Sequence, residues 1–203
     1  MTISRATGVL VLAALLLVLS GCAVREQRPA GAWVEEREDW FGLYSSWRVS
    51  GRLALSDGQQ GGQLSFDWRA EGDQHDVHLR TVAGGRQWRL LFNDQGALLE
   101  GSEVGLVRGP DPDLLVAEVV GWPIPVRRLA FWLRGLNSSL GEEVTYAADG
   151  TMTSIAGQDW VLEYQRYSQV ADGPLMPQRM QARSAPYEVR ILLRGWRWID
   201  PGA

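Results

Sequence analysis

Residues 47–56 read WRVSGRLALS, and they alternate between two kinds of side chain. One set is Trp47, Val49, Gly51, Leu53 and Leu55, and the set between them is Arg48, Ser50, Arg52, Ala54 and Ser56. Successive side chains of a strand point to opposite faces of a sheet. The pattern therefore predicts a strand with one buried face and one face in water.

The same period of two returns along the following sequence. Apolar rows recur as Leu64, Phe66 and Trp68, then Val77 and Leu79, then Trp88, Leu90 and Phe92. Further strands are expected near residues 144–146, 160–164, 180–182 and 189–198. Turn residues such as Asp57-Gly58 and Glu71-Gly72-Asp73 separate the rows. Short strands with frequent turns indicate an antiparallel meander, in a barrel or a sandwich.

Three helices are expected beside the strands. Trp33, Trp40, Tyr44 and Trp47 recur at helical spacing, which predicts a helix over residues 33–46 with Glu35, Glu36, Glu38 and Asp39 in solvent. Asp111-Pro112 is a helix start, and Gly121 ends that helix. Pro125 begins another, which Gly135 and Asn137 close. We predict a mainly β fold, one strongly curved sheet with the helices packed against its concave side.

The first residues resemble a secretory signal. Arg5 supplies a positive start, and residues 9–19 form an apolar run of 11 residues. A membrane-spanning helix needs roughly 20 apolar residues, so this run is too short to cross comfortably. It ends in LSGC at residues 19–22, the lipobox pattern in which the cysteine is acylated and the chain is cut before it.

The lipobox divides the chain into three parts. We predict a signal peptide at 1–21, a tether at 22–31 that begins with lipidated Cys22, and one domain at 32–203. Ala23 follows the cysteine in place of the Asp that retains many lipoproteins in the inner membrane, so we expect an anchor on the periplasmic face of the outer membrane. The alternative is a plain signal peptide with a chance cysteine.

Composition excludes several classes of function. The net charge of −4 and the pI near 5.3 disfavour nucleic acid binding. His75 and His78 are the only histidines and would point to opposite faces of a strand, so we expect no metal site and a solvated polar edge. Ten Trp indicate a wide apolar interior. We expect Arg127 and Arg128 on the surface of their helix.

An ordered set of motifs resembles a known family. The set comprises the lipobox, RVSGRLA at 48–54, FDW at 66–68, GWPIP at 121–125 with Leu129, Trp132 and Gly135-Leu136 after it, DWVLEY at 159–164, PLMP at 174–177 and WRW at 196–198. In this order the motifs are similar to those of the LolB family of outer-membrane lipoprotein receptors. The resemblance covers essentially the whole mature chain. It implies an unclosed β-barrel with a helical lid over an apolar cavity.

The resemblance also implies a function without catalysis or cofactor. Such a receptor is a monomer that accepts acylated lipoproteins from the periplasmic carrier LolA and inserts them into the outer membrane. Its partners are LolA, the acyl chains of the cargo and outer-membrane lipid. Two alternatives stay open, a hydrolase of envelope lipids or glycans and an assembly scaffold. The sequence shows neither a G-x-S-x-G motif nor a phosphate-binding glycine loop.

Two candidate sites follow from the resemblance. Inward-facing rings are expected to line the acyl-chain cavity, namely Trp68, Trp88, Phe92, Trp132, Trp160 and Tyr164. The same rings would equally fill a closed core. The family carries a protruding leucine in a Pro-Leu-Gly loop, and its counterpart here is Thr81-Val82-Ala83-Gly84. Val82 and Ala83 are therefore the candidate membrane-insertion residues, and an ordinary hairpin turn is the alternative.

Overall fold

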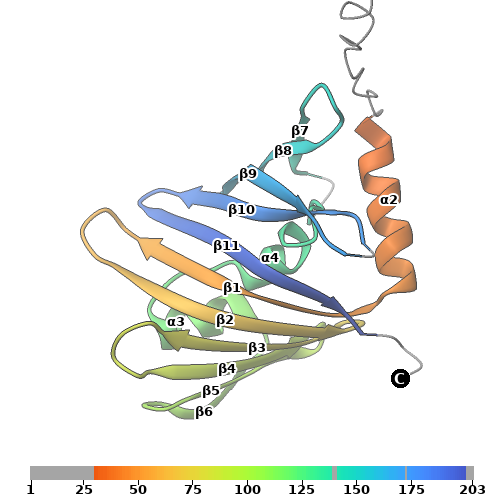
Figure 1. Ribbon diagram of the computed structural model, residues 1–203. Coiled ribbons are helices and arrows are strands. Elements are labelled where there is room, and N and C mark those ends of the chain that lie inside the picture. The colour runs from red at the N-terminus through yellow and green to blue at the C-terminus, as the bar shows by residue number, and fades with distance from the viewer. Residues whose placement is uncertain (1–29, 139–140, 172, 200–203) are drawn as a thin grey trace, which may run out of the picture.

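The computed structural model describes residues 30–138, 141–171 and 173–199. Their strands form one antiparallel sheet of eleven strands in the order β6-β5-β4-β3-β2-β1-β11-β10-β9-β8-β7 (Figure 1). The bounds are β1 Ser46–Ser56, β2 Gly61–Glu71, β3 Gln74–Thr81, β4 Gln87–Asn93, β5 Gly96–Gly101, β6 Gly105–Gly109, β7 Glu143–Tyr146, β8 Met152–Ala156, β9 Val161–Gln169, β10 Leu175–Ser184 and β11 Tyr187–Trp198. The helices are α2 Ala30–Leu43, α3 Pro112–Val120 and α4 Val126–Trp132.

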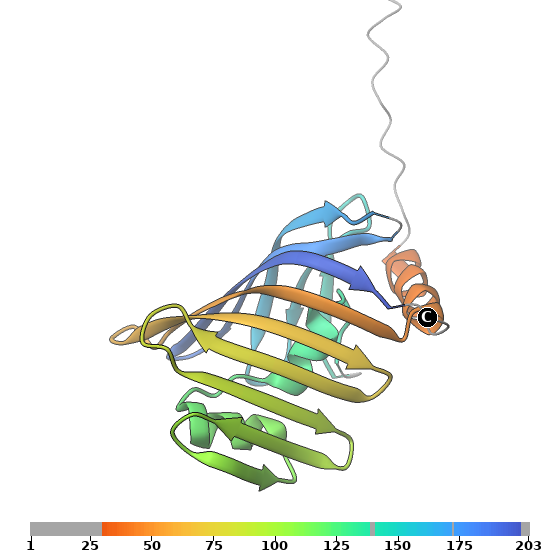
Figure 2. The ribbon, with the colours of Figure 1, turned by 60° about the horizontal axis from the view of Figure 1, so that its bottom comes forward.

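The sheet curves into an open trough. Its two edge strands, β6 and β7, do not pair with each other, so the barrel is unclosed (Figure 2). Helices α3 and α4 lie on the concave side, while α2 packs at one end of the trough (Figures 1 and 2). The predicted fold class is confirmed: the protein is mainly β, with a single curved antiparallel sheet and a few helices.

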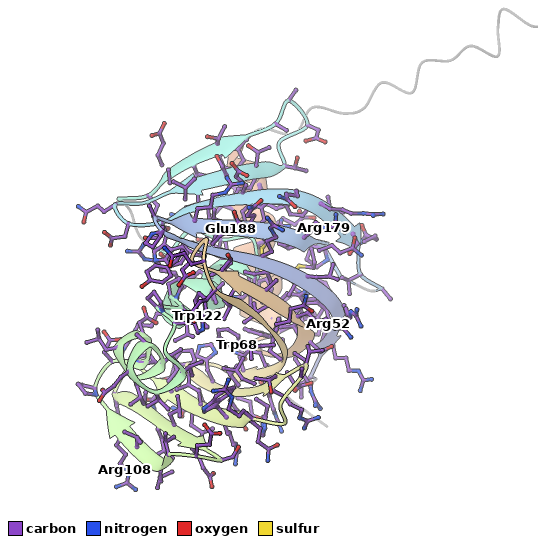
Figure 3. The ribbon with its side chains drawn as sticks, turned by 90° about the vertical axis from the view of Figure 1, so that its left-hand side faces the viewer. Arg52, Trp68, Arg108, Trp122, Arg179 and Glu188 are labelled. Carbon is purple, nitrogen blue, oxygen red and sulfur yellow. The ribbon has the colours of Figure 1, made fainter. Side chains whose placement is uncertain are left out.

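The two faces of β1 separate as the alternating sequence predicts. Trp47, Val49 and Leu53 are buried, whereas Arg48 and Arg52 are exposed. Figure 3 shows Trp68 of the neighbouring strand on the side that faces the helices, and Arg52 and Arg179 on the other side. The apolar rows of the sequence therefore line the concave face.

Gly51 lies where β1 and β11 approach each other closely. The pairing of β1 with β11 shifts register between Ser50 and Gly51, as at a β-bulge. A Cβ atom at Gly51 would overlap with the carbonyl oxygen of Leu192 and with the ring of Phe66. Only glycine allows the strands to approach this closely.

Helix α2 lies a little earlier in the chain than predicted. It runs from Ala30 to Leu43, so it begins inside the range predicted as tether, and Trp47 belongs to β1. Its buried face is Trp33, Arg37 and Phe41, at spacings of four residues. The predicted Trp40 and Tyr44 are only partly buried. The helix instead turns Arg37 inward, because its guanidinium finds acceptors on Arg134 and Leu175.

The helical pair follows its sequence signals closely. The Asp111 side chain accepts hydrogen bonds from the backbone N–H groups of Asp113 and Leu114, and Gly121 ends α3 in the left-handed region with φ of 81°. Helix α4 ends at Trp132, three residues before the predicted closing residue Gly135.

The predicted anchor falls outside this description. Cys22, the signal peptide and most of the tether precede residue 30. Among the helices that the structure describes, none has the length and hydropathy required to cross a membrane.

Candidate acyl-chain cavity

Helix α4 covers an apolar cavity on the concave face of the sheet. The cavity is lined by nine residues, Leu53, Phe66, Trp68, Val77, Leu79, Ile124, Val126, Leu129 and Leu133. Its volume is about 20 Å³, which is room for about one water molecule. All nine side chains are apolar or aromatic, so the cavity offers no charged group to a ligand. An acyl chain fits between these two apolar surfaces only if α4 moves away from the sheet.

The carboxyl end of this lid is held by side chains from distant parts of the chain. The Trp33 indole N–H donates to the carbonyl of Gly135 at 2.9 Å, and Arg37 Nε donates to the carbonyl of Arg134 at 3.0 Å. The Tyr164 hydroxyl donates to the carbonyl of Trp132 at 2.9 Å. These bonds satisfy carbonyl groups that a helix end leaves without partners. Helix α2 and strand β9 thereby fix one end of the lid.

Arg37 is the centre of this attachment. Its side chain is fully buried, and its guanidinium carbon lies 3.1 Å from the centre of the Trp33 ring. It also donates to the carbonyl of Leu175 on β10. A Cβ atom at Gly135 would lie 2.7 Å from Arg37 Nε, so glycine is needed for this approach.

The amino end of the lid has fewer attachments. Its N-cap residue, Pro125, makes no side-chain capping bond. The Arg127 N–H donates to Asp113 Oδ1 at 3.0 Å, which links α4 to α3. Burial raises the pKa of the Asp113 carboxyl, partly opposed by that hydrogen bond. Residues 121–125, which connect α3 to α4, pack against the start of β11. There the Trp122 ring lies edge-on to the Tyr187 ring, with centroids 6.2 Å apart.

The six predicted cavity residues are all buried, but they do not form one lining. Trp68 lines the cavity, and Trp88 lies directly opposite the cavity residue Leu79 across β3 and β4. Trp132 ends the lid helix, and its backbone carbonyl accepts the hydrogen bond from the Tyr164 hydroxyl. Trp160 is buried immediately before β9, not within it. That these rings meet an acyl chain stays a prediction.

Most of the cavity lining was not among the predicted site residues. Leu53, Val77 and Leu79 belong to rows that the sequence already placed inward, and Leu129 and Leu133 lie on the predicted lid helix. The alternation along the strands therefore already indicated that these side chains face the concave side. The predicted site residues were the aromatic rings alone, and the aliphatic side chains of the same rows were not among them.

His75 is not at a solvated edge, as was predicted for both histidines. Its Nδ1 accepts a hydrogen bond from the Trp68 indole N–H at 3.1 Å, and its ring stacks on Phe92 with centroids 4.5 Å apart. Burial, and secondly the charge of Arg134, lower the pKa of His75 to about 4. The imidazole is therefore neutral near pH 7. The prediction holds for His78, which is exposed and lies 3.3 Å from Asp76.

A second, larger hollow adjoins the cavity at the α2 end of the trough. This vestibule has a volume of about 590 Å³ and lies among α4, the end of α2 and the β2–β3 and β4–β5 turns. Its aromatic lining is Phe41, Trp47, Phe92 and Phe131, and its basic lining is Arg127, Arg128 and Arg134. The other polar residues of the lining are Ser45, Asp73, His75, Asn93, Asp94, Asp113 and Ser138. Arg127 and Arg128 are partly buried, and Arg128 keeps 31% of its side chain exposed beside Asp159.

The candidate insertion loop lies at the opposite end of the trough from α2 (Figure 1). It joins β3 to β4, and its Val82 side chain is 53% exposed. Ala83 is also exposed, and Gly84 and Gly85 follow with φ of 97° and 71°. The loop thus presents one aliphatic side chain to solvent on a glycine-rich turn.

The arrangement is an unclosed barrel with an apolar groove under a short helix, and comparison with known proteins identifies the family. A family model described as "Outer membrane lipoprotein LolB" matches residues 45–196. The chain belongs to the LolB family. This match extends from the first strand to the last, and so it includes the lid and both hollows.

Curated relatives agree with the family match. Outer-membrane lipoprotein LolB of Alkalilimnicola ehrlichii is 32% identical over 184 residues, covering 89% of this chain and 92% of the relative. LolB of Xanthomonas euvesicatoria pv. vesicatoria is 30% identical with coverage of 95% and 98%, and LolB of Tolumonas auensis is 28% identical with coverage of 90% and 92%. These relatives are named as lipoproteins of the outer membrane.

Solved structures show the same fold at low sequence identity. A LolA superfamily protein from Nitrosomonas europaea has a TM-score of 0.52 and 10% identity, covering 85% of this chain and 94% of that one. A putative outer membrane lipoprotein-sorting protein domain from Vibrio parahaemolyticus has a TM-score of 0.50 and 8% identity, with the same coverage.

Proposed function

We propose that this protein accepts the acyl chains of lipoproteins from the periplasmic carrier LolA and releases them into the outer membrane, to which lipidated Cys22 anchors it. The observation that carries the proposal is the wholly apolar contact between α4 and the concave face of the sheet. Membership of the LolB family supports the same role in lipoprotein localisation.

The energetics of the lid suit a reversible exchange. Burying an acyl chain stabilises it by about 0.8 kcal/mol per methylene, or about 10 kcal/mol for a whole chain. Lifting α4 removes Val126, Leu129 and Leu133 from the sheet, at about 1.5–3 kcal/mol for each side chain exposed to water. An entering acyl chain covers both surfaces again. The contacts between α4 and the sheet are thus replaced by contacts of both surfaces with the acyl chain, and opening the lid needs little net free energy.

The direction of transfer requires only a difference in affinity. A ligand moves to whichever site binds it more favourably, so cargo passes to this protein if its cavity holds acyl chains better than the carrier does. The bilayer, which buries the chains completely, is the final acceptor. Val82 and Ala83 offer the first apolar contact with that bilayer, at the opposite end of the trough from the attached end of the lid.

Acceptance of cargo tests the proposal. The full chain carrying Cys22→Ala is mixed with LolA loaded with a radiolabelled lipoprotein, and the two proteins are then separated. We expect the label to move to this protein. The matched control is the same cargo without its acyl groups, which we expect not to be held. Retention of the acylated cargo by LolA, or equal capture of the unacylated cargo, would contradict acyl-chain binding.

A further inference from the structure

The Trp68 side chain lies between the lining of the apolar cavity and the lining of the vestibule. Trp68 lines the cavity, and its ring contacts two rings that line the vestibule: Trp47, with centroids 6.2 Å apart, and Phe92, with centroids 5.9 Å apart. The hydrogen bond to His75, another vestibule residue, fixes the orientation of this indole. Rotation of Trp68 would therefore join the two hollows into one.

Helix α4 contributes to both hollows from adjacent faces. Leu129 and Leu133 line the cavity, while Ala130, Phe131 and Arg134 line the vestibule. Phe131 is 37% exposed, so an apolar ring stands at the solvent side of the vestibule. The lining thus changes from mixed polar and aromatic in the vestibule to wholly apolar in the cavity.

The basic residues of the vestibule are only partly engaged by the protein. Arg127 Nη2 donates to the carbonyl of Pro110, and Arg128 lies 3.8 Å from Asp159. Arg127 Nε and Arg128 Nη1 are buried, and neither has a partner among the residues that the structure describes.

We propose that the vestibule is the port through which an acyl chain enters and that the Trp68 indole is its gate. The inference rests on the proposed function, and it adds the end of the trough at which cargo arrives. The order of residues along β3 agrees: His75 borders the vestibule, Val77 and Leu79 line the cavity, and Val82 follows the strand. At about 3.3 Å per residue, this path is about 23 Å long. Cargo enters at one end and meets the membrane at the other.

Uptake of cis-parinaric acid, a fatty acid that fluoresces in apolar surroundings, tests the port. Stopped-flow uptake is measured for the full chain carrying Cys22→Ala and for three further variants in that chain. Ser45→Trp places a bulky ring at an exposed position of the vestibule wall, and we expect uptake at least 5-fold slower. Trp68→Phe keeps an aromatic ring without the bond to His75, and we expect uptake about 2- to 10-fold faster, the range that one neutral hydrogen bond spans. Gln59→Trp, at an exposed position of the β1–β2 turn at the other end of the trough, is the matched control and should leave the rate unchanged.

The outcomes separate the port from the function. If Gln59→Trp slows uptake and Ser45→Trp does not, the acyl chain enters at the opposite end of the trough and the proposed port is wrong. An unchanged rate in Trp68→Phe, with normal thermal unfolding, removes the gate. If the parent chain takes up no fatty acid at all, the proposed function itself fails. Ser45 lies on the surface, so its variant stays informative even if Trp68→Phe folds poorly.

Discussion

The indole N–H of Trp68 donates a 3.1 Å hydrogen bond to Nδ1 of His75. The bond ties a ring of the apolar cavity to a ring of the vestibule, and it requires an unprotonated Nδ1. The pKa of His75, lowered to about 4 by burial and by the charge of Arg134, keeps that nitrogen available near neutral pH. His75 thereby fixes the position of the Trp68 ring between the cavity and the vestibule.

Stability should depend on pH through this histidine. The pKa of about 4 in the folded protein lies below the ordinary value of 6.5. Between these values the unfolded chain binds a proton that the folded chain does not, so the free energy of unfolding falls as pH falls from 6.5 to 4. At about 1.36 kcal/mol per pKa unit, the loss attributable to His75 is about 3 kcal/mol. Urea unfolding at pH 7 and pH 4.5 should show a smaller drop for His75→Phe than for the wild type. A drop in His75→Phe as large as that of His78→Asn, the exposed control, would contradict this.

A bound fatty acid should offset the loss of stability caused by shortening a side chain of the lid. Leu129→Ala removes a buried side chain over the cavity and should destabilise the protein by about 2–5 kcal/mol. Palmitic acid can fill the space left, so it should raise the melting temperature of Leu129→Ala more than that of the wild type. Leu115→Ala, a matched truncation on α3 outside the cavity lining, should lose stability without this extra gain. Equal ligand shifts in all three proteins would place the ligand elsewhere.

The attachment of α2 to the lid should be a large contribution to stability. Arg37→Met leaves the carbonyls of Arg134 and Leu175 without their donor, and we expect a loss of about 3 kcal/mol or more in chemical denaturation. Arg52→Met, on the exposed outer face, should change stability by about 0.5 kcal/mol at most. Similar small effects of both substitutions would show that α2 is held by its aromatic contacts alone.

Delivery into membranes should depend on the β3–β4 loop. Val82 is about half exposed, so its insertion contributes about 1 kcal/mol, which corresponds to about 5-fold in rate. Val82→Glu should slow release into vesicles by about that factor and leave acceptance from LolA unchanged. Gln59→Glu, in the β1–β2 turn at the same end of the sheet, controls for added charge. Wild-type delivery by both Val82→Glu and Ala83→Glu would leave the loop as a plain hairpin.

The anchor can be tested separately. Cys22→Ala removes the predicted lipidation site, and we expect a protein of unchanged fold that fractionates with the soluble periplasm. Circular dichroism checks the fold, and fractionation checks the location. Recovery in the membrane fraction after washing with high salt would show that another part of the chain holds the protein there.

The strands and the lid could be predicted because their signals are local. The alternation from Trp47 to Leu55 depends on neighbouring residues, and Asp111 caps its helix within three positions. The burial of Arg37 could not be predicted, since its acceptors lie 97 and 138 residues away in the chain. The same holds for the vestibule, whose walls come from α2, α4 and two turns. A sequence shows which side chains face inward, but not which inward side chains meet.

Transfer from carrier to membrane tests the central claim most directly. LolA loaded with a radiolabelled acylated lipoprotein is incubated without nucleotide, with vesicles that contain the lipidated wild-type protein or with vesicles that lack it. We predict that the label moves into the bilayer only where the protein is present, and that Ser45→Trp slows this movement. Label that stays on LolA in both samples, or that enters both kinds of vesicle at the same rate, would contradict the account.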